Sequence, residues 1–175
     1  NESVSIRNQE FIFTPSSFPY KLKINFIQHN SITVRVFSHL YISIIMDGYE
    51  TKIIDIKYTI DSMFNDMYFQ HLENTTFNTD VSDEQDKLLR DTFKGSVHQL
   101  ICLLINMEKS KGNINNITKI SLQPARIQGQ SNNITGLIEY YRKIGFAMND
   151  DKMTMSSDIL NFLSFCMSKQ VSKTL

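Results

Sequence analysis

The sequence contains no tryptophan, three prolines and six glycines among its 175 residues. Asn, Ile and Lys are abundant instead, which is typical of a compositionally biased genome rather than of low-complexity disorder. A chain of this length fits one domain that buries a core without metal or disulfide staples. We therefore expect residues 1–175 to form a single domain, with residues 1–20 as a flexible or edge segment.

The sequence also lacks net charge, because 18 Lys and Arg residues balance 18 Asp and Glu residues. Without a basic field a protein holds a nucleic-acid backbone poorly, and only Lys21, Lys23 and Arg35 suggest a local basic patch. Long apolar runs are missing as well, since residues 40–46 and 99–107 are too short or too interrupted for a membrane span. The composition disfavours nucleic-acid and membrane partners.

Cysteine is scarce, and the two cysteines form no Cys-x-x-Cys pattern. Cys102 and Cys166 both lie in apolar, helix-like surroundings, which argues against a zinc site and against a disulfide scaffold. Such residues suit a reducing environment, so we expect an intracellular, cytoplasmic protein.

His98 and Cys102 are four residues apart, a helix spacing that metal ligands or a nucleophile pair would use. No third ligand lies nearby in the sequence. We therefore expect no metal site and interpret Cys102 as a buried hydrophobe, with a Cys-His hydrolase as the alternative.

Alternating apolar and polar residues predict β-structure over the first half of the chain. Asp47-Gly48 predicts a tight hairpin, because the primed turns need positive φ at their central positions. Residues 61–86 show no clear period, and we expect a short helix and a loop there. The predicted strands, in order, cover residues 21–26, 32–37, 40–46 and 49–60.

The second half changes to helical spacing. One apolar stripe predicts an amphipathic helix that ends near Gly112, and its members are Val97, Leu100, Ile101, Leu104 and Ile105. The elements expected after it are a strand at 117–123, a helix ending at Gly145, a hairpin at 146–155 and a final helix at 157–169. Together these elements predict an α+β fold with a mixed, mostly antiparallel central sheet flanked by helices.

The final predicted helix belongs to an extra C-terminal segment, residues 157–175, that is more apolar than a one-faced surface helix requires. We interpret its apolar residues as extra core packing. Self-association into a homodimer is the second interpretation.

The run Tyr141-Arg142-Lys143-Ile144-Gly145-Phe146 resembles the Tyr-x-Lys-Leu-Gly-Phe motif that frequently ends the fourth helix of the GNAT acyltransferase superfamily. The resemblance covers roughly residues 90–155, the acetyl-CoA-binding half of that family. It implies that Tyr141 lies beside the thioester sulfur and protonates the leaving thiolate. In the family an Asn and a small residue precede the tyrosine. Asn133 and Gly136 match them when counted to Tyr140, which makes Tyr140 the alternative acid.

A second similarity concerns the loop that opens the third helix of the family, Arg/Gln-x-x-Gly-x-Gly/Ala, whose amides bind the CoA pyrophosphate. The first N–H groups of a helix have no internal partner and suit an anion. Arg90 and Gly95 match the outer positions of the loop, whereas Phe93 stands at the middle glycine, where its side chain would crowd the phosphates. The cofactor-binding residues that the resemblance implies are Arg90, Lys94, Gly95, Ser96, Val97 and Asn133.

The resemblance implies an acetyl-CoA-dependent N-acyltransferase, in which an amine of a small molecule or protein attacks the thioester directly. It places the carbonyl-polarising N–H within residues 53–57. It also implies a sheet that is splayed between residues 53–60 and 117–123 to admit the pantetheine arm. Asp55 is our candidate general base, and Glu50 and His71 are the alternatives.

The first half of the chain departs from the family, which follows its first strand with two helices that shape the acceptor pocket. Strand patterns occupy that region here. This departure and the position of Phe93 favour a rival interpretation, in which the chain is a non-catalytic binding or assembly module with the GNAT fold.

Overall fold

The structure is a computed structural model that describes residues 5–16, 18–30, 35–78, 83–124 and 134–174. Its elements, in chain order, are β1 (Ser5–Phe13), β2 (Lys21–Asn30), β3 (Arg35–Met46), β4 (Tyr49–Asp61), β5 (Asp66–Asn74), the 3-10 helix η1 (Thr75–Asn78), α1 (Glu84–Phe93), α2 (Ser96–Ser110), β6 (Lys119–Leu122), α3 (Ile134–Lys143), β7 (Ala147–Met148), β8 (Met155–Asp158) and α4 (Ile159–Thr174).

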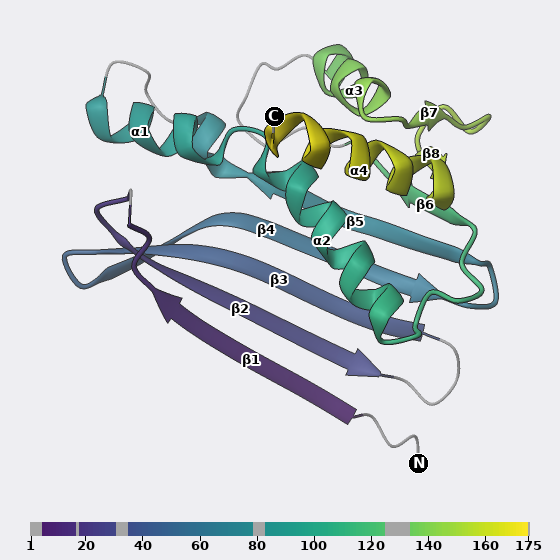
Figure 1. The fold of residues 1–175 in the computed structure, drawn as a ribbon, viewed down its shortest axis with the longest axis horizontal. Coiled ribbons are helices and arrows are strands. Elements are labelled where there is room, and N and C mark those ends of the chain that lie inside the picture. Colours follow the sequence, from purple (N-terminus) through teal and green to yellow (C-terminus); the bar gives the residue numbers. More distant parts are fainter. Residues whose placement is uncertain (1–4, 17, 31–34, 79–82, 125–133, 175) are drawn as a thin grey trace. The chain divides into compact units, whose positions relative to one another are not determined.

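The strands of the described residues form one eight-stranded sheet in the order β1-β2-β3-β4-β5-β6-β8-β7. The pairs β1–β2, β2–β3, β6–β8 and β7–β8 are antiparallel, and β5 and β6 run parallel. Figure 1 labels the strands in this order. The expected α+β class with a mostly antiparallel sheet is confirmed.

The chain separates into two compact units. Unit 1 consists of Asn1–Thr59 and Gln70–Val97, and unit 2 consists of Ile60–Phe69 and His98–Leu175. The strands β4 and β5 each contribute residues to both units.

Unit 1 is built on long antiparallel strands whose side chains alternate between a buried and a more exposed face. On β3, Leu40, Ile42 and Ile44 are buried at every second position. The separate strands predicted at 32–37 and 40–46 are wrong in the described residues, because Arg35–Met46 forms the single strand β3 and buried Ser38 continues it. Gln28 Nε2 on β2 donates to Ser38 Oγ at 3.1 Å, so these two buried polar side chains are paired with each other.

The hairpin between β3 and β4 is confirmed at its predicted position. Asp47 and Gly48 have φ angles of 51° and 82°, the left-handed conformation that a primed two-residue turn requires. The turn leads directly into β4, which begins at Tyr49.

β5 is the main departure from the predicted fold. It occupies a segment that we expected to hold a short helix and a loop, yet Met67 and Phe69 alternate along it at 0% and 1% exposure. Asn65, with φ at 52°, turns the chain into this strand. Because β5 separates β4 from β6 in the strand order, the expected splay between residues 53–60 and 117–123 is wrong.

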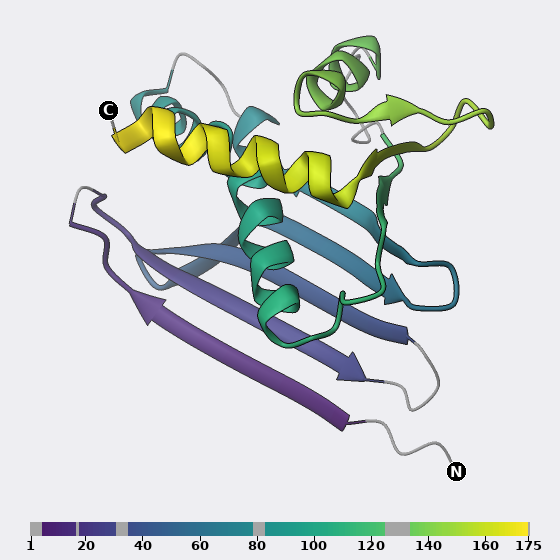
Figure 2. The same cartoon turned by 45° about the vertical axis from the view of Figure 1, so that its right-hand side comes forward.

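Unit 2 contains α2 from His98 onward, the helices α3 and α4, and the strands β6, β7 and β8. The predicted apolar stripe of α2 is confirmed, since Ile101, Leu104 and Ile105 are buried. α3 is followed by Gly145 at φ 104°, and Phe146 N donates to Tyr141 O at 3.0 Å, as in a glycine-ended helix. Figure 2 shows α3 leading into the β7–β8 hairpin.

Candidate functional site

The predicted pyrophosphate loop forms the corner between α1 and α2. Arg90 lies in the last turn of α1, and Lys94 is the C-terminal cap of that helix. Gly95 then adopts φ 74°, and α2 begins at Ser96, followed by Val97. These five predicted cofactor-binding residues therefore flank one helix start. Asn133, the sixth, lies outside the described residues.

The side chain of Phe93 belongs to the packed interior of unit 1. Its ring is 7% exposed and meets the ring of Phe18 edge to face, with centroids 5.8 Å apart. Its carbonyl accepts hydrogen bonds from Asn74 Nδ2 at 3.1 Å and from Ser96 Oγ at 2.6 Å. A Cβ placed on Gly95 would meet no atom within 4 Å. The ring is thus engaged with Phe18, and the space beside Gly95 is open.

The two candidate tyrosines near the end of α3 differ in accessibility. Tyr141 is 5% exposed and packs edge to face on Phe146, with ring centroids 6.1 Å apart, whereas Tyr140 is half-buried. Burial raises the pKa of both phenols above the ordinary value, and the neighbouring Tyr140 adds to the effect at Tyr141. Both side chains are therefore protonated at neutral pH, and Tyr140 is the one that a substrate reaches more readily.

Asp55 on β4 lies in an ion-pair cluster of unit 1. One carboxylate oxygen is 2.5 Å from His39 Nε2, and the other is 3.3 Å from Lys52 Nζ. The ammonium of Lys52 also lies 4.7 Å from the ring centroid of Tyr41. Burial acts to raise the pKa of Asp55, but the hydrogen bond and charge of His39 together with Lys52 outweigh it and hold that pKa below its usual range. A carboxylate with a lowered pKa is a weak general base.

His39 is a titratable neighbour that the sequence did not reveal. Two consecutive buried residues, Ile53 and Ile54, interrupt the alternation of β4. Simple counting from the Asp47-Gly48 turn does not place His39 beside Asp55 when the alternation is broken in this way. Sequence signals for such a contact are weak, because both residues also suit an exposed strand face.

The alternative bases are likewise held in pairs. Glu50 accepts a hydrogen bond from Lys23 Nζ at 3.2 Å, which lowers the pKa of the carboxyl group. His71 Nε2 lies 2.9 Å from Glu73 Oε2. Glu50 lacks the raised pKa that would favour a carboxylate as general base, and the imidazole of His71 is held by Glu73.

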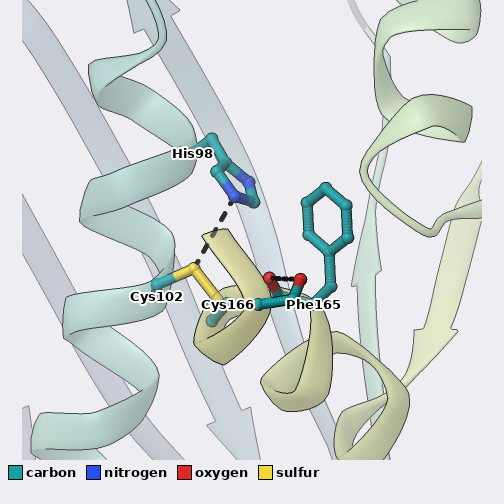
Figure 3. Close-up of a disulfide and its surroundings, with 5 residues drawn as sticks. His98, Cys102, Phe165 and Cys166 are labelled. Atoms are coloured by element: carbon teal, nitrogen blue, oxygen red, sulfur yellow. Dashed lines mark hydrogen bonds between the residues drawn. A yellow bond between two sulfur atoms is a disulfide. The ribbon is translucent and has the colours of Figure 1, made fainter. Parts of the chain in front are cut away.

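Cys102 and Cys166 form a disulfide between α2 and α4, with their Cα atoms 5.9 Å apart (Figure 3). The prediction that the cysteines are not linked is therefore wrong. The pairing depends on two helices separated by 64 residues, a proximity that cysteine spacing cannot show. Disulfides persist in oxidising compartments, so the cysteines no longer support the expected cytoplasmic location.

His98 lies over this disulfide in the interior of unit 2. Its Nε2 is 3.9 Å from Cys102 Sγ, and its ring contacts Phe162 and Phe165 with centroids 5.8 Å and 5.1 Å away. Figure 3 shows His98 and Cys102 on the same side of α2. A disulfide sulfur is no nucleophilic thiolate, so the Cys-His hydrolase alternative is not supported. Among the described residues no three His, Cys, Asp or Glu side chains form a metal site.

A shallow polar pocket of about 310 Å³ lies in unit 2. Close by in sequence, Ser121 Oγ donates to Asp66 Oδ1 at 2.8 Å, and burial raises the pKa of Asp66 despite this bond and the charge of Lys119. No predicted site residue lines the pocket, whose walls are Thr118, Lys119, Ser156, Ser157 and Asp158.

Comparisons of the chain with protein families, with curated proteins and with solved structures find no match. None of the helices in the described part of the chain has the length and apolar character to cross a membrane.

Proposed function

We propose that the chain is a GNAT-type domain that binds acetyl-CoA and transfers the acetyl group to an amine. The observation that carries the proposal is the parallel strand pair β5–β6, with α1 and α2 between its strands and α3 and the β7–β8 hairpin after it. This order agrees with the acetyl-CoA-binding half that the Tyr141–Phe146 motif implies. Since fold alone does not define a function, each site residue needs its own test.

The proposal assigns the opening for the pantetheine arm to β5 and β6 in place of β4 and β6. The described register of this pair joins Asp66–Phe69 to Lys119–Leu122, which is four residues on each strand. β5 is then the strand expected to supply the N–H group that polarises the thioester carbonyl, instead of residues 53–57.

The helix start at Ser96 is the proposed pyrophosphate site. The first amides of a helix attract an anion because they lack internal partners and carry the positive end of the helix dipole. The open space beside Gly95 and the packing of Phe93 on Phe18 support this assignment. Lys94 is exposed and adds a positive charge next to the helix start.

Tyr140 is the proposed general acid. In the reaction the amine nitrogen bonds to the thioester carbon, the C–S bond breaks, and the departing thiolate takes the phenol proton of Tyr140. The attacking nitrogen loses a proton to water, and the phenolate is protonated again from solvent. We do not assign Asp55 as the base, because its lowered pKa and its bonds to His39 and Lys52 make it a poor proton acceptor.

Thermal unfolding with and without acetyl-CoA tests the cofactor site. A ligand at about one hundred times its dissociation constant adds roughly 2.7 kcal/mol, which raises the Tm of a chain of this size by about 5–10 °C. Gly95→Glu should abolish the shift by placing a carboxylate at the helix start. Gly95→Gln is the matched control, since it carries the same strain at positive φ without the charge. Desulfo-CoA should give a shift like that of acetyl-CoA, because it keeps the pyrophosphate. No shift at millimolar acetyl-CoA would reject the proposal.

Two phenylalanine variants then test the acid. Tyr140→Phe should lower kcat by about a hundredfold and leave KM for acetyl-CoA unchanged, because a positioned acid contributes on that order. Tyr141→Phe should leave kcat within about twofold of the unmodified protein. Steady-state assays with a panel of amines measure both constants, and the opposite ranking of the two variants would assign the acid to Tyr141.

The rival function is a non-catalytic module with the same fold. The observation that favours it is the paired state of every carboxylate and imidazole that we considered as a base. A thermal shift with acetyl-CoA but no turnover of any amine would support this module and exclude the transferase.

A further inference from the structure

The first strand, β1, forms an open edge of the sheet in the described part of the chain. It stands at the end of the strand order and pairs with β2 without a bulge, from Ser5 opposite Asn30 to Phe13 opposite Leu22. Its outer row of main-chain N–H and C=O groups faces away from β2. Such a row is a template for pairing with another strand.

β1 carries few of the features that usually protect an edge strand, since its only charged residues are Arg7 and Glu10. It contains no lysine and no proline, and every residue from Arg7 to Phe13 is exposed. The consecutive residues Phe11, Ile12 and Phe13 are 57%, 56% and 44% exposed. Exposed apolar residues on a long, regular edge are uncommon in monomeric proteins and indicate an interaction surface.

The apolar residues of β1 continue the buried face of the neighbouring strand. Phe11 and Phe13 lie opposite Ile24 and Leu22 of β2, and Leu22 is 7% exposed. Opposite residues of antiparallel strands share one face of the sheet. A strand added beyond β1 would therefore cover Phe11 and Phe13 on one face and Ile12 on the other.

We propose that the occupant of this edge is β1 of a second copy of the chain, paired antiparallel about a two-fold axis that stands perpendicular to the sheet. Such an axis places the same face of the sheet on the same side in both copies. Residues that lie opposite each other must therefore both be even-numbered or both be odd-numbered. The register that uses the whole of Ser5–Phe13 is centred on Gln9. It places Gln9 opposite Gln9, Asn8 opposite Glu10, and Arg7 opposite Phe11 of the second copy.

The two charges of β1 disfavour the registers centred on Glu10 and on Arg7. A register centred on Glu10 would set two carboxylates against each other, and one centred on Arg7 would oppose two guanidinium groups. The Gln9-centred register opposes no like charges and lets each Arg7 guanidinium lie over a phenylalanine ring. This dimer is independent of the acetyl-CoA proposal, since it uses none of the proposed site residues.

Cross-linking tests the register directly. In the proposed dimer, directly opposite Cβ atoms lie about 4.5–5.5 Å apart, so Gln9→Cys should form an intermolecular disulfide on mild oxidation. Arg7→Cys is the matched control, because its two copies would be offset by roughly 13 Å along the strands. The native cysteines are already paired, so each variant adds one reactive thiol. Equal cross-linking of both variants, or of neither, would overturn the proposal.

A charge exchange tests the pairing in solution. Phe11→Lys should raise the dimer dissociation constant at least tenfold, because the ammonium would face Arg7 of the second copy. Adding Arg7→Glu to Phe11→Lys should restore association, and Leu160→Lys on exposed α4 should leave it unchanged. Sedimentation velocity over a range of concentrations measures these effects. If the protein were a monomer at every concentration, the β1 edge would have to pair with a strand of another protein. If only Leu160→Lys dissociated the dimer, the interface would lie on α4. Either result overturns the proposal.

Discussion

The Asp55 cluster gives unit 1 a stability contribution that depends on pH. The pKa of the folded carboxyl group lies below its ordinary value of 3.8, so the charged form is favoured in the folded state. The contribution is fully present above the unfolded pKa and is lost as the pH falls through the lower folded pKa. His39 and Lys52 are the partners on which it depends.

Asp55→Asn should therefore lower the free energy of unfolding by about 1 kcal/mol at pH 7 and by much less at pH 2.5. Urea unfolding at the two pH values measures the difference. Combining it with His39→Gln in a double-mutant cycle isolates the pair, and a coupling energy that did not change with pH would contradict the assignment.

At the scale of elements, the Cys102–Cys166 disulfide is the covalent connection between α2 and α4. It closes a loop with a sequence separation of 64 residues. Cross-linking a loop of that length reduces the entropy of the unfolded chain, which stabilises the folded state by about 4 kcal/mol in the chain-entropy model.

The double variant Cys102→Ala, Cys166→Ala should accordingly lose about 4 kcal/mol of unfolding free energy. Guanidinium unfolding with and without dithiothreitol measures this loss. Reduction should destabilise the unmodified protein by a similar amount and leave the double variant unchanged. An equal response of both proteins to the reductant would show that the helices are not linked in solution.

The β3–β4 turn offers a second test at this scale. Gly48 has φ 82°, and a Cβ added at this position would meet no atom within 4 Å, so Gly48→Ala would be strained by its backbone conformation and not by a clash. We expect a loss of about 1 kcal/mol. Asp47→Asn should change stability little, because Asn tolerates positive φ. Chemical denaturation of both variants decides whether the turn has the described conformation, since equal stability of Gly48→Ala would contradict it.

At the scale of the whole molecule, the balance of charges controls solubility. The formal net charge is zero at pH 7 and the isoelectric point is about 7.1. Proteins associate most readily where net charge vanishes, because mutual repulsion is then weakest.

The chain should therefore be least soluble near pH 7 and more soluble at pH 5.5 and at pH 9. Precipitation by polyethylene glycol across this range measures the trend. Phe11→Lys should raise solubility most strongly near pH 7, because it adds charge at the open β1 edge. A flat solubility profile would mean that charge balance does not govern association.

Local patterns were sufficient for part of the fold. The Asp47-Gly48 hairpin and the apolar stripe of α2 depend on the identities and spacing of neighbouring residues, and the structure confirms both. β5 was missed because polar residues around Asn65 obscure the alternation of Met67 and Phe69. The candidate site was predictable only as segments, such as the Arg90–Val97 corner and the two tyrosines of α3.

The α+β class, the antiparallel first half and the positions of α2 and the β3–β4 turn were predictable from the sequence. These features follow from φ preferences and side-chain periods within a few residues. The three-dimensional packing was needed to show that β5 stands beside β6, that Cys102 meets Cys166, that His39 contacts Asp55, and that Tyr141 is buried while Tyr140 is only half-buried. Each of these depends on contacts between residues from different elements, which the period of any one segment does not encode.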